Sequence, residues 1–115
     1  MRNKLVLIFG FDTKSLFGNI KYSMEDRRAH LIIVGKVQGV FYRASAKDTA
    51  VTLGLTGYVK NLPDGFVEIV AEGSPGKLNQ LIEWCKAGPA NAQVTDVKTT
   101  ISPSIGEFDN FHIEY

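Results

Sequence analysis

Residues 29–54, AHLIIVGKVQGVFYRASAKDTAVTLG, decide the fold, because two hydrophobic periods follow one another in them. Residues 29–34 are short, branched and apolar, as in a central strand, and they stop at Gly35. Apolar side chains then recur at helical spacing, at Tyr42, Ala46, Ala50 and Leu53. This spacing puts them on one face of a helix that Gly54 closes. The stretch therefore predicts a strand, a loop and a helix in succession.

The next segment, residues 56–72, predicts a β-hairpin. TGYVKN and FVEIVAE, residues 56–61 and 66–72, have strand composition, and LPDG between them supplies Pro, Asp and Gly in turn positions. In the second strand, the apolar residues Val67, Ile69 and Ala71 alternate with Glu68 and Glu72, as in a strand with one apolar face.

Residues 74–88 contain the start and stop signals of a second helix. Ser74 is suited to the N-cap, Pro75 to the first helical position, and Gly88 with Pro89 to the exit. Its expected buried stripe consists of Leu78, Leu81, Ile82 and Cys85. Two strands are predicted to follow, at residues 93–101 and 108–115, the second with Phe111, Ile113 and Tyr115 on one face.

This order predicts an α+β fold: a ferredoxin-like split βαβ sandwich, β-α-β-β-α-β plus a terminal strand. We expect an antiparallel sheet with both helices on one face. The two strands of the first βαβ unit must run parallel, so the loop after the first strand and Asn61, at the end of the second, should lie at the same end of the sheet. Two polar features far apart in the sequence become neighbours.

Composition excludes several functional classes. The 115 residues are 44% hydrophobic and 22% charged, as in an ordinary globular domain, and the net charge of +1 lacks the basic excess of a general nucleic-acid binder. The single cysteine, Cys85, excludes an intrachain disulfide and is expected to fill the core; it suits a reducing, cytoplasmic location. The longest apolar run, residues 5–11, is shorter than the roughly 20 residues that span a bilayer.

Residues 1–24 differ from the rest of the chain, and three interpretations compete for them. They could be a signal peptide, an added edge strand or a loosely attached leader. The leader is slightly favoured, because EDRR, residues 25–28, is typical of the solvated entry to the strand that follows, and no small-residue cleavage pattern closely follows the apolar run. We therefore expect one domain over residues 25–115.

The loop GKVQGVFYR, residues 35–43, has the composition of an anion site. Gly35 and Gly39 permit a backbone nest at a helix N-terminus, and the Arg43 guanidinium matches phosphate or carboxylate with two parallel hydrogen bonds. The loop lacks the Gly-Lys-Ser/Thr ending of a nucleotide-binding P-loop. A small phosphorylated or carboxylated molecule is the expected ligand.

Two segments carry a family resemblance. IVGKVQGVFYR, residues 33–43, resembles the acylphosphatase signature, and GYVKNLPDGFVEIVAEG, residues 57–73, is similar to the family's second signature with every fixed spacing kept. The resemblance covers nearly all of residues 29–115. Two positions depart mildly: Tyr42 stands where phenylalanine is usual, and Phe41 is bulkier than the residue often found.

The resemblance implies metal-independent hydrolysis of the carboxyl-phosphate bond of small acyl phosphates, with no cofactor. It implies that Arg43 binds the substrate phosphate together with the loop amides, and that Asn61 places the attacking water. The implied phosphate loop consists of Val37, Gln38, Gly39, Val40, Phe41, Tyr42 and Arg43. Inorganic phosphate is the expected product and competitive inhibitor. A monomer that binds neither nucleic acid nor membrane is expected.

Other functions were weighed against this one. An RNA-recognition module shares the β-α-β-β-α-β order, but the near-neutral charge and VQGV in the loop argue against it. A domain that binds a ligand or handles carbamoyl phosphate within a larger maturation protein is a third possibility, less favoured for so short a chain. A metal site of His30, His112 and Cys85 is discounted, because Cys85 is expected in the core.

Overall fold

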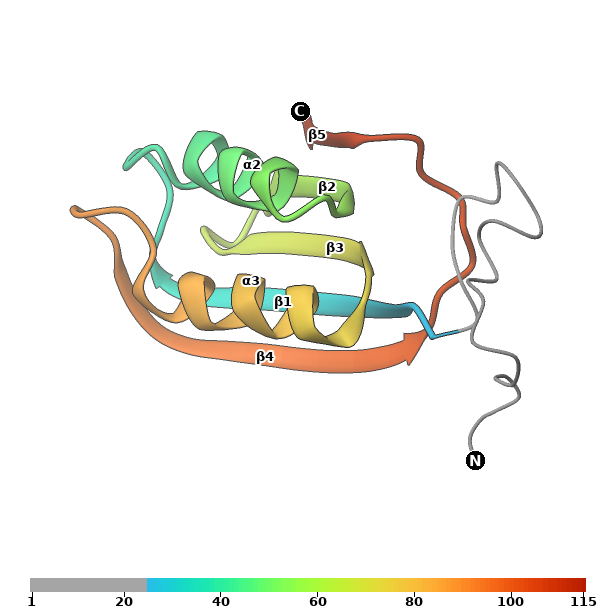
Figure 1. Cartoon of the computed structure of the whole chain (residues 1–115). Coiled ribbons are helices and arrows are strands. Elements are labelled where there is room, and N and C mark those ends of the chain that lie inside the picture. The colour runs from blue at the N-terminus through green and yellow to red at the C-terminus, as the bar shows by residue number, and fades with distance from the viewer. Residues whose placement is uncertain (1–24) are drawn as a thin grey trace, which may run out of the picture.

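The computed structural model describes residues 25–115, and its element order is the predicted one (Figure 1). The elements are β1 (Arg27–Lys36), α2 (Tyr42–Thr52), β2 (Thr56–Asn61), β3 (Val67–Gly73), α3 (Pro75–Ala87), β4 (Gln93–Pro103) and β5 (Phe111–Glu114). β1 and β4 extend beyond their predicted limits, whereas β5 is shorter than predicted. The leader predicted for residues 1–24 lies outside the described residues.

The strands form one sheet in the order β4-β1-β3-β2-β5. β1 pairs antiparallel with β3 and with β4, and β2 pairs antiparallel with β3, but β5 pairs parallel with β2. The sheet is therefore mixed: it is antiparallel, as expected, except where the terminal strand β5 joins its edge. The connection after β4 crosses to the other edge of the sheet without changing ends, so β5 must start where β2 starts and run in the same direction.

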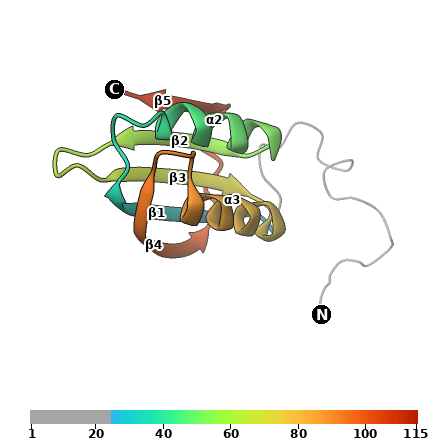
Figure 2. The same cartoon turned by 90° about the vertical axis from the view of Figure 1, so that its left-hand side faces the viewer.

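Both helices pack on one face of the sheet, as predicted (Figures 1 and 2). Alternate residues of the central strands point toward them, such as Leu31 and Ile33 in β1, which are fully buried. Cys85 on α3 is also fully buried, and desolvation raises the pKa of its thiol to about 12. Its predicted role as core filler is confirmed.

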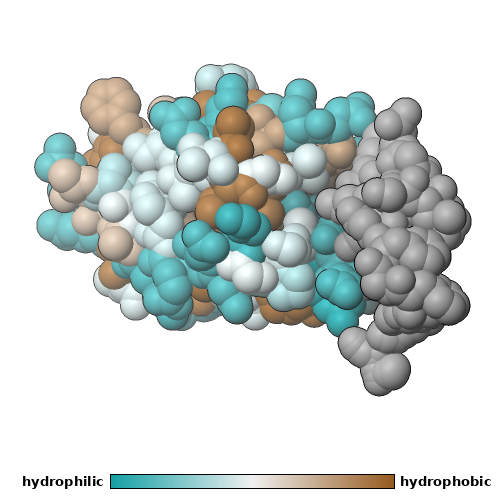
Figure 3. All heavy atoms as spheres, viewed as in Figure 1, coloured by the Kyte–Doolittle hydropathy of each residue, from teal (hydrophilic) through white to brown (hydrophobic). Residues whose placement is uncertain are grey.

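The ends of α3 follow the sequence signals. The hydroxyl of Ser74 caps α3 by accepting a hydrogen bond from the Lys77 N–H, and Gly88 ends the helix with a positive φ of 67°. Hydrophilic residues cover much of the outer surface of the helical layer, with a hydrophobic group near its middle (Figure 3). In the described part of the chain, no helix is long and apolar enough to cross a bilayer.

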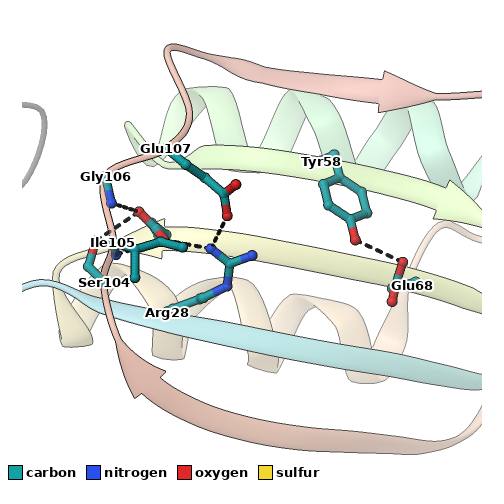
Figure 4. A network of polar contacts seen from close by, with 8 residues as sticks. Arg28, Tyr58, Glu68, Ser104, Ile105, Gly106 and Glu107 are labelled. Carbon is teal, nitrogen blue, oxygen red and sulfur yellow. Dashed lines mark hydrogen bonds and ion pairs between the residues drawn. The ribbon is translucent and has the colours of Figure 1, made fainter.

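Glu72 is buried, because the connection between β4 and β5 crosses over it. Glu72 is only 4% exposed. Its carboxylate accepts hydrogen bonds from the Arg28 guanidinium (2.9 Å), the Ser104 hydroxyl (2.8 Å) and the N–H groups of Ile105 (3.1 Å) and Gly106 (2.9 Å). Figure 4 shows these groups together, with Glu107 on the other side of Arg28. Glu72 thus anchors the crossing connection to the central strand β3.

Candidate active site

The loop between β1 and α2 is held in place from both ends. Gly35 has a φ of 135° beside a register shift in the β1–β4 pairing, and a Cβ atom there would collide with the carbonyl oxygen of Gln93. Val37 inserts its side chain into the core and is 1% exposed. The loop is therefore anchored to the edge strand and to the core, which gives its exposed part a defined position.

The exposed part of the loop carries two left-handed residues. Gly39 has a φ of 74°, as expected for a glycine in a nest. Phe41 has a φ of 64° and a ψ of 25°, and it is the one non-glycine residue with a positive φ among residues 25–115. A bulky residue in this region stores strain, and such strain concentrates at functional sites. The sequence signals did not predict this conformation of Phe41.

α2 begins directly after Phe41 and leaves its first amides available. Phe41 is the N-cap residue but its side chain accepts no hydrogen bond, and the Ser45 N–H donates to the Phe41 carbonyl at 3.1 Å. The N–H groups of Tyr42, Arg43 and Ala44 precede the first helical hydrogen bond, so they have no acceptor within the helix. Such a helix start favours an anion through its free donors and its dipole.

Gln38 contributes to the loop in a different way from its neighbours. Its side-chain amide donates to the carbonyl oxygens of Leu62 and Phe66, both at 2.8 Å. These two carbonyls belong to the turn between β2 and β3, which Leu62 also closes by donating its N–H to Phe66 at 2.9 Å. The Gln38 side chain therefore fixes the loop against the hairpin that carries Asn61.

Tyr42, the first residue of α2, turns its side chain away from the loop surface. It is 2% exposed, and its hydroxyl donates to the carbonyl oxygen of Cys85 at 2.8 Å. Burial raises the pKa of this phenol, so it stays a donor. The ring lies 5.3 Å from the ring of Trp84, between their centroids. Only backbone groups of Tyr42 can therefore take part in an anion site.

Arg43 presents a charge without a carboxylate partner. Within residues 25–115 its guanidinium forms no ion pair, and its central carbon lies 5.2 Å from the centroid of the Tyr115 ring. An arginine that stacks on an aromatic ring keeps its N–H donors free for another acceptor. The guanidinium is thus oriented and still able to bind an oxyanion with two parallel hydrogen bonds.

Asn61 and the loop line the same cavity, which confirms the predicted neighbourhood. The cavity has a volume of about 310 Å³. Its lining comes from the loop, the start of α2, the end of β2 and β5: Val37, Gly39, Phe41, Tyr42, Arg43, Ala44, Asn61, Ile113 and Tyr115. Figure 2 shows the β1–α2 loop and the end of β5 at the same end of the molecule.

The contribution of β5 to this cavity was not predicted from the sequence. It placed Phe111, Ile113 and Tyr115 on one face of a strand, and in the structure Phe111 enters the core while Ile113 and Tyr115 line the cavity. The alternating pattern was the only available signal. Locating it at the site required the parallel pairing with β2, which the pattern does not contain.

The histidines of the discounted metal site lie elsewhere. His30 contacts Glu68 at 2.8 Å and His112 contacts Glu114 at 2.7 Å, while Cys85 is in the core. Over residues 25–115, no three or more His, Cys, Asp or Glu side chains gather in a group that could hold a metal ion. The cavity instead offers backbone amides, one guanidinium and one carboxamide.

Comparisons with known proteins agree with this arrangement. The acylphosphatase family model matches residues 29–113. An acylphosphatase of Marinobacter nauticus is 54% identical over 88 residues, which cover 76% of this chain and 96% of the relative; one of Methylococcus capsulatus is 48% identical over 87 residues, 76% and 95%. The crystal structure of acylphosphatase from Bacillus subtilis superposes with a TM-score of 0.75 at 38% identity, covering 77% of this chain and 99% of that one. The chain therefore belongs to the acylphosphatase family, hydrolases that act on the carboxyl–phosphate anhydride.

Proposed function

We propose that Arg43 and the backbone amides of residues 37–43 hold the phosphoryl group of an acyl phosphate, and that Asn61 positions the attacking water. The main support is that Arg43 lines one cavity with Asn61 and the strained loop. Within the described chain, Arg43 has no carboxylate partner. These groups come from three separate elements. Their convergence provides donors for a phosphate and a polar group for a water molecule.

Binding of the phosphoryl group follows from the charges and donors present. Phosphoryl transfer spreads negative charge over the three non-bridging oxygens, and catalysis depends on positioning and electrostatic stabilisation. The free amides at the start of α2 and the forked guanidinium of Arg43 supply fixed donors for these oxygens. Because the loop is anchored by Val37 and Gln38, little reorganisation is needed when charge develops.

The leaving group and the attacking water need little catalytic assistance from the protein. The leaving group is a carboxylate whose parent acid has a pKa of about 4, so it departs without a general acid. The Asn61 carboxamide offers a donor and an acceptor that can orient water in line with the leaving carboxylate. Among residues 25–115, the side chains that line the cavity include no Asp, Glu or His to serve as a base, so the proton of the water passes to a phosphate oxygen of the substrate.

The products are a carboxylate and inorganic phosphate, and the mechanism requires no metal ion. Inorganic phosphate carries the same oxygens as the transferred group, so we infer that it competes with substrate for Arg43 and the amides. We further propose that the protein acts as a cytoplasmic monomer, since a lone buried thiol suits a reducing compartment.

Hydrolysis of benzoyl phosphate by the purified full-length chain, with a chelator present, tests the proposal. We expect rapid turnover that the chelator leaves unchanged and that phosphate inhibits competitively. Turnover that stops with chelator and returns with a divalent metal would overturn the metal-independent mechanism. Phosphate binding without turnover would indicate instead a ligand-binding domain built on the same fold.

A further inference from the structure

Two exposed aromatic side chains flank the cavity that holds Arg43. Phe41 is 80% exposed and Tyr115 is 92% exposed, and both line the cavity, together with the half-buried Ile113. In the free protein these large aromatic side chains leave most of their apolar surface in water, so a ligand that covered them would gain free energy from its burial. Phe41, moreover, is held in a strained backbone conformation that projects it from the loop. The rim of the cavity is thus apolar where it faces solvent.

The proposed function already assigns a binding partner to Arg43, to the amides at the start of α2 and to Asn61. The amides at the start of α2 and Arg43 face the phosphoryl group, and Asn61 faces the water. Among residues 25–115, the other side chains that line the cavity are apolar apart from the Tyr115 hydroxyl, and they include no acidic side chain and no second cation. An acyl group with its own charge would find no partner there, whereas an apolar one would cover Phe41 and Tyr115.

We propose that Phe41 and Tyr115 are specificity-determining residues that bind the acyl substituent, so that the enzyme prefers acyl phosphates with apolar, planar acyl groups. This inference rests on the proposed function, since it assumes that the phosphoryl group binds at Arg43. An aromatic acyl group can stack on either ring, and the methyl group of acetyl phosphate is too small to cover them.

Tyr115 also lies over the Arg43 guanidinium, so its loss would disturb phosphate binding as well. Phosphate binding is common to all acyl phosphates, and a disturbance there lowers kcat/KM for every substrate by the same factor. The ratio of kcat/KM for two substrates that differ only in the acyl group cancels this factor. That ratio therefore reports the acyl contact alone.

The test measures kcat/KM for benzoyl phosphate and for acetyl phosphate in the wild type, Phe41→Asn, Tyr115→Ala and Ile101→Ala. Asparagine tolerates the left-handed conformation of position 41 and removes the apolar surface. Ile101 is an exposed apolar residue of β4 that does not line the cavity, so its variant is the matched control. The inhibition constant of inorganic phosphate is measured in each protein to check the loop.

We expect the benzoyl-to-acetyl ratio to fall about three- to tenfold in Phe41→Asn and in Tyr115→Ala. The ratio should not change in Ile101→Ala, and any change in phosphate binding in Phe41→Asn affects both substrates alike and cancels in the ratio. A ratio that stays at the wild-type value in both rim variants overturns the inference while leaving the hydrolase intact. If the wild type hydrolyses neither substrate, the proposed function fails instead.

Discussion

Arg28 lies near the start of β1 and Arg43 lies beyond its other end, and the two arginines have opposite surroundings. Arg28 donates to Glu72 at 2.9 Å and to Glu107 at 2.6 Å, and its guanidinium lies 5.4 Å from the centroid of the Phe108 ring. Arg43, beyond the other end of β1, has an aromatic ring beside it and, within the described chain, no carboxylate. One arginine has its hydrogen bonds made by the protein, and the other keeps them for a ligand.

The backbone shows the same contrast. At the Arg28 end, the N–H groups of Ile105 and Gly106 donate to the buried Glu72 carboxylate. At the Arg43 end, the amides that open α2 lack a capping side chain and Phe41 is strained. Polar groups satisfied within the fold stabilise it, whereas unsatisfied donors held in a fixed position are available to a substrate. Stability and activity should therefore respond to different substitutions.

The largest effect is expected for Arg43→Ala. It removes the only cationic side chain that lines the cavity among residues 25–115, and kcat/KM should fall roughly 10³-fold, with phosphate inhibition lost. The free energy of unfolding should change by less than about 0.5 kcal/mol, because no buried carboxylate loses its partner. Steady-state kinetics and urea unfolding measure the two quantities.

Arg27→Ala, an exposed arginine at the start of β1, is the matched control for Arg43 and should retain full turnover. Arg43→Lys keeps a charge without the planar fork and should recover only part of the lost activity. If Arg43→Ala is still inhibited by millimolar phosphate, then Arg43 does not bind phosphate.

A smaller loss, about 10²-fold in kcat, is expected for Asn61→Ala. The variant loses the group that orients water but keeps the donors for phosphate, so the inhibition constant of phosphate should stay close to that of the wild type. Asn91→Ala, an exposed asparagine before β4, serves as control. An unchanged kcat in Asn61→Ala would reject Asn61 as the water-positioning residue.

Glu72→Ala changes the Arg28 end of the molecule and should lower stability instead of activity. It leaves two backbone N–H groups and one arginine without this acceptor, and we expect a loss of about 2–3 kcal/mol in the free energy of unfolding. Turnover of the folded protein should change little. Glu83→Ala removes an exposed carboxylate paired with Lys86 and should leave stability almost unchanged.

The same carboxylate makes stability depend on pH. Burial raises the pKa of Glu72, but hydrogen bonds from Ile105, Ser104, Gly106 and Arg28 outweigh it, so the pKa lies below its ordinary value of 4.5. A lowered pKa in the folded state stabilises the protein above pH 4.5, and this contribution is lost as pH falls through the folded pKa. Urea unfolding from pH 7 to pH 3 should show the loss, and Glu72→Gln should weaken it.

The smallest effect is expected for Tyr42→Phe. The variant removes the buried hydrogen bond to the Cys85 carbonyl, which should cost about 1 kcal/mol of stability. Its kcat/KM should stay within about twofold of the wild type, because the side chain faces the core and only the backbone of this residue reaches the site. A large loss of activity with unchanged stability would place the hydroxyl in the reaction.

The neighbourhood of Asn61 and the loop was predictable because its causes are local. The spacing of Tyr42, Ala46 and Ala50 predicts the helix, and the parallel direction of β1 and β2 follows from the βαβ order. Gly39 predicts a left-handed backbone conformation at this position, since glycine adopts that conformation freely. These signals were sufficient to place Arg43 and Asn61 at one end of the sheet.

Features that depend on distant segments were not predictable. Alternation within β3 places Glu72 on the face of the strand opposite to its apolar side chains, and the crossing connection that buries Glu72 there is distant in the sequence. The conformation of Phe41 has no residue signal, because phenylalanine rarely adopts a positive φ. Tyr115 reaches Arg43 only through the parallel pairing of β5 with β2.

The anchoring of the crossing connection by Glu72 has a consequence for how the chain closes. Bringing β5 to β2 requires the closure of a loop that spans the sheet from edge to edge, and the entropic cost of closure grows with the length of free chain. By capturing residues 104–106 at the central strand, Glu72 divides this closure into two shorter ones. A carboxylate remote from the cavity thereby eases the docking of the strand that supplies Ile113 and Tyr115 to its wall.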